Sequence, residues 1–177
     1  MKRIKCITDL TLGIDNLYSR SHPRRTARAI IENSNGNIAL LHTDEYSLYS
    51  LPGGGIEPGE DIHSALTREI VEETGCNIVS IRELGYIEEN RGYCDYTQIS
   101  YFFLVKTDSI EFHPRLTVTE KKYGTTVDWY TKEEVKRLLS DKDIKADLTK
   151  DQTNQIKFLK ARDLAAFTEY LNHHKKL

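Results

Sequence analysis

Short runs of apolar and β-branched residues, separated by turn residues, dominate the first two thirds of the chain. Such runs are typical of strands with one or both faces buried. Asn35-Gly36 supplies residues that accept a positive φ, which predicts a tight hairpin connection. The pattern predicts strands within 26–43 (two strands joined by that turn), 46–51, 79–89, 96–106 and 125–131.

Three segments have the apolar spacing of helices. Asp61 is a suitable N-cap for a helix that runs to Thr74, and Gly75 stands where a left-handed residue commonly ends a helix. Thr131 and Glu134 form a capping-box pattern at the start of a helix over 132–139. A last helix is expected over 149–173, with a buried stripe of Ile156, Leu159, Phe167 and Leu171.

Two stretches lack a regular pattern. The run 52–59 is rich in glycine and proline, so we expect no regular structure there. Residues 1–24 have weak patterning and predict an ordered but peripheral arm. The order of strands, helix, strands and helices predicts a mixed α/β sandwich, with one domain over 1–177 and its core at about 25–140.

Composition and charge narrow the classes of function. Lys and Arg number 25 against 27 Asp and Glu, a net charge of −2, so the chain as a whole is not an electrostatic nucleic-acid binder. A run of about 18 apolar residues, as a membrane span needs, is missing. Asp9 and Asp15 interrupt the basic N-terminus before an apolar signal region can form. Three cysteines without metal-ligand spacing suggest reducing surroundings, so we expect a cytoplasmic protein.

A cluster of carboxylates at the end of the 61–74 helix is the strongest chemical signal. Glu69 and Glu73 continue the apolar stripe of this helix, and Glu72 flanks it. Glu69 and Glu73 repel each other at i, i+4 spacing. All three glutamates lie near the helix C-terminus, the negative end of the helix dipole. Arg68 offsets only part of this charge. A hard divalent cation, Mg²⁺ or Mn²⁺, would neutralise the rest, whereas the alternative is a solvated acidic face.

The residues around this cluster have a fixed spacing: Gly54-x5-Glu60-x7-Arg68-Glu69-Ile70-x-Glu72-Glu73-x-Gly75-Cys76. This pattern resembles the Nudix box of the Nudix hydrolase family, G-x5-E-x7-R-E-U-x-E-E-x-G-U, in which U is a bulky aliphatic residue. Only Cys76 departs from it, as a small apolar substitute that affects packing more than chemistry. Flanking runs, among them Leu-Pro-Gly-Gly, extend the resemblance over about 25–140.

The resemblance implies a fold and a reaction. The family's fold is an α/β/α sandwich around a mixed sheet, and its reaction is the metal-dependent hydrolysis of a nucleoside diphosphate linked to another group X. Arg68 would orient the carboxylates, and Glu60 would pair with Arg68 or assist the attacking water. By resemblance, the metal ligands would be Glu69, Glu72, Glu73 and the carbonyl of Gly53, with Glu72 also counted among the catalytic residues.

Residues outside the box are less constrained. Glu120 is our candidate for a late acidic residue that acts as general base, although an ordinary loop glutamate is an equal alternative. Arg24 and Arg25 precede the first core strand and are candidates to contact substrate phosphate. Tyr93 lies at an offset that resembles family members acting on dinucleoside polyphosphates, but with ten tyrosines in the chain coincidence is the stronger alternative.

Two classes of function stay open. The leading expectation is a Mg²⁺- or Mn²⁺-dependent pyrophosphohydrolase with a small nucleotide-type substrate, and with neither nucleic acid nor membrane as a partner. The alternative is a non-catalytic Nudix-fold module that binds a nucleotide metabolite as a sensor or regulator, although the box is undamaged. The last helix would either close the core or form a homodimer contact.

Overall fold

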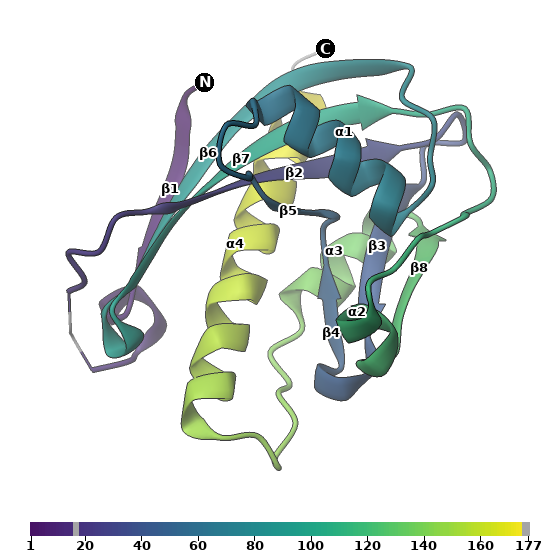
Figure 1. Cartoon of the computed structure of the whole chain (residues 1–177). Coiled ribbons are helices and arrows are strands. Elements are labelled where there is room, and N and C mark those ends of the chain that lie inside the picture. The colour runs from purple at the N-terminus through teal and green to yellow at the C-terminus, as the bar shows by residue number, and fades with distance from the viewer. Residues whose placement is uncertain (16–17, 175–177) are drawn as a thin grey trace.

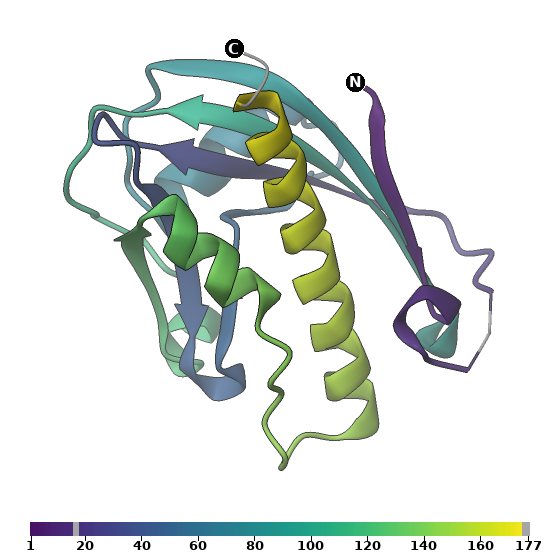
Figure 2. The same cartoon turned by 180° about the vertical axis from the view of Figure 1, so that it is seen from behind.

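The computed structural model describes residues 1–15 and 18–174 as a curved mixed sheet with helices on both faces (Figure 1). Helix α1 (Ile62–Glu73) covers one face, while α3 (Lys132–Ser140) and α4 (Lys150–His174) cover the other, as the reverse view shows (Figure 2). A short helix, α2 (Val118–Lys122), precedes the last strand. This is the predicted α/β/α sandwich, and the fold class is confirmed.

Within the described residues the sheet has eight strands, in the order β1-β6-β7-β2-β3-β4, with β5 paired to β2 and β8 paired to β3. The strands β1 and β6 are parallel, as are β7 and β2, whereas the other pairs are antiparallel. The bounds are β1 Arg3–Thr8, β2 Arg24–Glu32, β3 Ile38–Thr43, β4 Leu48–Ser50, β5 Gly53–Gly55, β6 Ser80–Arg91, β7 Tyr96–Lys106 and β8 Thr125–Tyr130.

Alternation along β2 divides the core into two layers. Ala27 and Ala29 pack under α1 with Leu66, whereas Ile30 packs on the other face with Phe158 of α4. The last helix therefore closes the core, which is one of the two roles expected for it. Of its predicted stripe, Ile156 and Phe167 are buried, whereas Leu159 and Leu171 are only half-buried.

Most predicted elements are confirmed, including the two capping patterns at Asp61 and Thr131. The turn between β2 and β3 lies where it was predicted, but only Gly36 of the Asn35-Gly36 pair has a positive φ (80°). The side chain of Asn33 also stabilises this turn, because it accepts hydrogen bonds from the backbone N–H groups of Asn35 and Asn37. The strand expected at 46–51 is shorter, since Asp44–Tyr46 form a 3₁₀ turn before β4.

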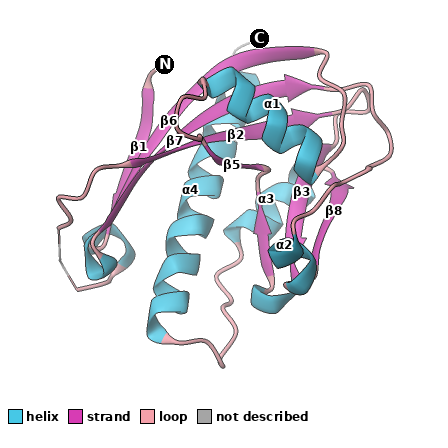
Figure 3. Ribbon diagram, in the orientation of Figure 1, coloured by secondary structure: helices cyan, strands magenta, loops and turns pink. Residues whose placement is uncertain are grey.

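One expectation was wrong and another was incomplete. Residues 53–55 are not irregular, because they form β5 and pair with Thr26, Ala27 and Arg28 (Figure 3). Residues 1–24 are not merely a peripheral arm, since β1 adds a parallel edge strand to β6 and buries Ile7 completely; residues 16–17 of that arm lie outside the described residues. In the part of the chain that is described, none of the helices has the length and apolar character that crossing a bilayer demands.

Candidate active site

Helix α1 presents the predicted acidic cluster to the sheet. It starts where the Asp61 carboxylate accepts hydrogen bonds from the N–H groups of His63 (2.9 Å) and Ser64 (3.1 Å). It ends before Gly75, whose φ of 69° terminates the helix with a left-handed residue. The buried residues of the helix are Ala65, Leu66, Ile70 and Glu73, so the stripe that carries a carboxylate into the interior is observed.

The glycine run lies directly beneath these carboxylates. The Gly53 N–H donates a hydrogen bond of 2.5 Å to the Glu73 carboxylate. A Cβ atom placed on Gly54 would lie 2.5 Å from a carboxylate oxygen of Glu69. Glycine at 54 therefore lets the backbone of β5 lie against the Glu69 carboxylate, which would have to rotate away if residue 54 carried a side chain.

Arg68 holds several carboxylates at once. Its guanidinium donates two hydrogen bonds of 3.0 Å to Glu60, one of 2.8 Å to Glu69 and one of 3.3 Å to Glu72. A further bond of 2.9 Å reaches the carbonyl of Gly55. The pairing with Arg68 lowers the pKa of Glu60 and raises that of Arg68. Arg68 thereby links the helix, the loop before it and the glycine strand.

Glu73 is the electrostatically costly member of the cluster. Burial raises the pKa of Glu73 to about 8, against the opposing effects of Arg28 and the Gly53 N–H, and the charges of Glu69 and Glu120 add to the rise. Burial also raises the pKa of Glu69, although its hydrogen bond to Arg68 opposes this. The two carboxylates thus lie in a site that disfavours their own ionised forms.

A divalent cation fits this donor set chemically, because carboxylate and carbonyl oxygens are the ligands that Mg²⁺ and Mn²⁺ prefer. The cation would also remove the cost of ionising Glu73. Over residues 1–15 and 18–174, however, no three acidic, histidine or cysteine side chains converge on one point. Glu69 and Glu72 bond to Arg68 while Glu73 bonds to Gly53, so joint ligation requires their side chains to rotate.

The other candidate residues lie at different distances from this cluster. Glu120 forms a capping box with Thr117 at the start of α2, and its charge raises the pKa of Glu73. The Arg24 guanidinium lies beside Gly55, since a Cβ there would meet its Nη2 at 2.7 Å. Arg25 lies over the ring of Tyr101, 5.5 Å from its centroid. The structure therefore brings Arg24 to the glycine run, whereas the hydrogen bonds of Glu120 are with Thr117 at the start of its own helix.

Tyr93 lies elsewhere. It belongs to the turn between β6 and β7, where its ring packs near that of Phe158 of α4 (6.2 Å between centroids). Its backbone N–H donates to Asp9. These contacts place Tyr93 on the α4 face of the sheet, whereas α1 covers the opposite face.

Sequence reasoning missed a group of charged residues behind the glycine run. Arg28 of β2 donates a hydrogen bond of 3.0 Å to the carbonyl of Leu51, and the N–H of Leu51 donates one of 3.0 Å to Asp163 of α4. Arg162, which is 1% exposed, pairs with Asp163 at 2.7 Å. A usable signal was present in the sequence, because Arg28 interrupts the apolar run 27–31, and Arg162-Asp163 interrupts the apolar pattern of the last helix.

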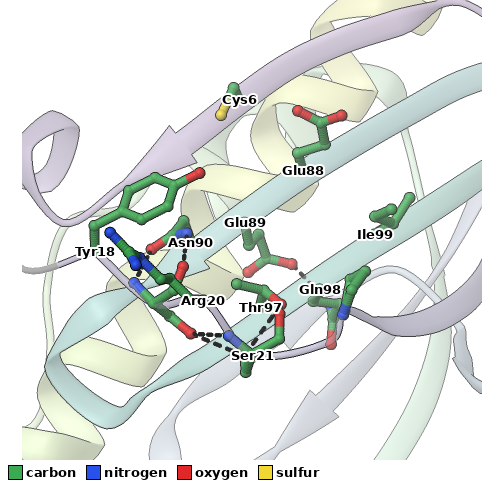
Figure 4. A pocket seen from close by; sticks show the side chains of 12 residues that line it. Cys6, Tyr18, Arg20, Ser21, Glu88, Glu89, Asn90, Thr97, Gln98 and Ile99 are labelled. Atoms are coloured by element: carbon green, nitrogen blue, oxygen red, sulfur yellow. Dashed lines mark hydrogen bonds between the residues drawn. The ribbon is translucent and has the colours of Figure 1, made fainter.

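A separate cavity of about 380 Å³ lies at the far end of the sheet (Figure 4). The segment around Ser19 and Ser21 covers part of it, and the side chains of Asn90 and Thr97 hydrogen-bond to that segment. No residue of the Nudix-like spacing lines this cavity. It is therefore distinct from the acidic cluster.

The fold and the site together define an α/β/α protein in which an acidic helix lies against a glycine-rich strand. The model of the NUDIX domain family matches residues 22–152, well over half of the chain. The chain therefore belongs to the Nudix family.

Curated relatives match over shorter segments. A Bacillus subtilis (strain 168) protein provisionally named 8-oxo-dGTP diphosphatase is 39% identical over 59 residues, which are 33% of this chain and 40% of that protein. An RNA pyrophosphohydrolase of Rhodopseudomonas palustris (strain BisA53) is 40% identical over 50 residues, 28% of this chain and 27% of the relative. The matches thus span less than half of either relative.

Solved structures share the fold at low identity. The MutT NUDIX hydrolase of Burkholderia pseudomallei has a TM-score of 0.53 and 19% identity, over 80% of this chain and 98% of that one. The NUDIX domain of Shewanella oneidensis NrtR, solved with ADP ribose, has a TM-score of 0.55 and 15% identity, over 67% and 79% of the two chains. These similarities concern the fold alone.

Proposed function

We propose that this protein is a pyrophosphohydrolase that uses Mg²⁺ or Mn²⁺ to cleave the diphosphate linkage of a nucleoside diphosphate joined to another group. The observation that carries the proposal is the buried Glu73 carboxylate, held by the Gly53 N–H beside Glu69 at the end of α1. A site that raises the pKa of its own carboxylates is suited to an added positive charge. The names of the curated relatives, a diphosphatase and an RNA pyrophosphohydrolase, are consistent with this chemistry.

Each residue of the cluster has a proposed part. Glu69, Glu72, Glu73 and the Gly53 carbonyl would hold the cation, which when bound supplies charge neutralisation at the diphosphate and activation of water. Arg68 would set the orientation of Glu69 and Glu72, and Glu60 would fix Arg68 through its paired hydrogen bonds.

Glu120 would accept the proton of the attacking water. In support, the negative charge of Glu120 adds to the rise in the pKa of Glu73. The competing hydrogen bonds of Glu120 to Thr117 would have to open for this role.

The three candidate substrate-binding residues differ in how well the structure supports them. Arg24 would contact a phosphate that approaches the glycine strand, and its position beside Gly55 supports this role. Arg25, whose guanidinium lies over the ring of Tyr101, would contribute to substrate binding through its positive charge. Tyr93 has no comparable support, because its ring packs near Phe158.

A substrate panel tests the proposal. We would incubate the protein with damaged nucleoside triphosphates, ADP-ribose, nucleotide sugars and dinucleoside polyphosphates, each with Mg²⁺, Mn²⁺ or chelator. We expect metal-dependent hydrolysis of at least one of them, with incorporation of one ¹⁸O atom from labelled water into a phosphate product. The exposed Glu133→Gln variant is a matched control that should hydrolyse the substrate at the wild-type rate.

A nucleotide that stabilises the fold without being hydrolysed would instead favour the sensor alternative. One structural neighbour, the NrtR domain, was solved with ADP ribose, so that ligand belongs in both arms of the experiment.

A further inference from the structure

Arg28 is a cation without a carboxylate partner in the interior. It lies on β2 between Ala27 and Ala29 and faces the opposite side of the sheet from them, toward α4. Its Nη1 donates to the Leu51 carbonyl, whereas its Nε is buried and has no hydrogen-bond partner. Within residues 1–15 and 18–174, no carboxylate lies within ion-pair distance of this guanidinium. The side chain as a whole is only half-buried, so part of it stays accessible to solvent.

An unpaired guanidinium in such a position is costly. Burial lowers the pKa of Arg28 to about 10, and the nearby charge of Arg162 adds to this, although Asp163 and Glu73 act in the opposite direction. Those carboxylates influence Arg28 from a distance but do not hydrogen-bond to it, so its charge is not neutralised by direct contact. The structure thus keeps a guanidinium that Leu51 already orients and that no carboxylate contacts, and an anion would meet the part of this half-buried side chain that stays accessible.

The position of Arg28 relates this donor to the acidic cluster. Arg28 pairs with Gly53 across β2 and β5, and a Cβ on Gly53 would lie 3.0 Å from Cγ of Arg28. The N–H of the same Gly53 donates to Glu73. Gly53 therefore lies between Glu73 and Arg28, two charged groups that act on each other electrostatically but form no direct ion pair.

We propose that Arg28 is a substrate-binding residue whose guanidinium donates to an anionic oxygen of the substrate's diphosphate group. The proposal rests on the proposed function, since a cation–diphosphate complex presents positive charge to Glu73 and negative charge to Arg28. The donors are fixed before binding, because Leu51 holds Nη1 and Asp163 of α4 holds Leu51. Little side-chain order is then lost when the ligand binds.

The experiment measures binding of methylenediphosphonate, a diphosphate analogue that cannot be hydrolysed, by calorimetry with and without Mg²⁺. We expect Arg28→Gln to weaken binding roughly 10- to 100-fold, because a charge-assisted hydrogen bond is lost. Arg28→Lys keeps the charge and a donor for Leu51 but lacks the planar fork, so it should fold like wild type and recover only part of the affinity. The control Arg82→Gln removes the same charge from an exposed position of β6 and should bind like wild type.

A readout on the wild-type protein avoids dependence on any variant's fold. The ¹⁵Nε–H resonance of Arg28, assigned by its absence in Arg28→Lys, should shift when the analogue is added. The proposal is overturned if the folded Arg28 variants bind the analogue within twofold of wild type, if that resonance does not move at saturation, or if wild type does not bind the analogue.

Failure of the proposed function gives a different result. If the protein binds the analogue through Arg28 but hydrolyses no substrate, the proposed binding role of Arg28 holds and only the proposed enzymatic function is excluded. Conversely, hydrolysis with an unchanged kcat/KM in Arg28→Gln retains the enzyme and removes this site.

Discussion

The carboxylate of Asp163, in the middle of α4, accepts a hydrogen bond of 3.0 Å from the backbone N–H of Leu51, two residues before Gly53. Residues 112 positions apart in the chain are thereby joined at the glycine run. Because the matched Nudix region ends at residue 152, this support comes from outside it. The last helix therefore does more than close the core, since it fixes the backbone on which the acidic cluster rests.

Asp163→Ala should destabilise the protein by about 3–5 kcal/mol, because the buried Arg162 loses its partner and the Leu51 N–H loses its acceptor. Asp163→Asn keeps an acceptor for the Leu51 N–H and should therefore lose less stability than Asp163→Ala. Urea unfolding of both variants measures the difference, with exposed Asn172→Ala of α4 as control. Equal stability of Asp163→Ala and wild type would show that the Arg162 pair contributes nothing.

Glu73→Gln should reduce turnover at least about 100-fold while the fold is retained, because a proposed metal ligand is lost from the site. In chelator at pH 7 the variant should also melt at a higher temperature than wild type. The reason is that burial raises the pKa of Glu73 to about 8, so folding at pH 7 requires a carboxyl group that is ionised in the unfolded chain to take up a proton. Activity assays and thermal unfolding of the same preparations check both statements, and wild-type turnover in the variant would exclude a role for Glu73.

Gly53 and Gly54 should respond differently to alanine. A Cβ on Gly53 would collide with the carbonyl oxygen of Ala27, and the φ of 128° is strained for any other residue, so Gly53→Ala should lose about 2 kcal/mol of stability or more. A Cβ on Gly54 meets only the end of the Glu69 side chain, which can rotate. Gly54→Ala should therefore fold but lose activity. Melting temperature and turnover, measured on both, distinguish the two; a fully active Gly54→Ala would place Glu69 outside the reaction.

Glu32 should make stability depend on acidic pH. Burial by itself would raise the pKa of Glu32, but hydrogen bonds from Lys106 and Tyr170 outweigh it, so the pKa is lowered in the folded protein. A group of this kind stabilises the fold above its unfolded pKa, and that contribution disappears as the pH falls through the lower folded value. Glu32→Gln should cost roughly 1.5–3 kcal/mol at pH 7 and have a flatter stability profile as the pH falls below the ordinary carboxyl pKa of about 4.5. Exposed Glu133→Gln, as control, should follow the wild-type profile in urea unfolding at each pH; a Glu32→Gln profile parallel to it would contradict the assignment.

The sequence by itself determined the elements whose causes are local. The cap at Asp61, the capping box at Thr131 and the left-handed Gly75 depend on residues within one helical turn, so their patterns could be identified without a partner. The acidic stripe of α1 was predictable for the same reason, because periodicity alone places Glu73 with Ile70 on the buried side.

Only the tertiary structure decided what those elements face. Gly53–Gly55 became a strand because β2 supplies hydrogen-bond partners from 26 to 28, which no local propensity of glycine predicts. In sequence, Arg28 and Asp163 stand out only as charges within apolar stretches, and the packing of the sheet against α4 decided that both hold the Leu51 backbone behind the glycine run. Tyr93 had a suitable offset in sequence, but the β6–β7 turn carries it to Phe158. Offsets along a chain fix neighbours within a helix or turn, whereas neighbours across a sheet are set by pairing and packing between distant segments.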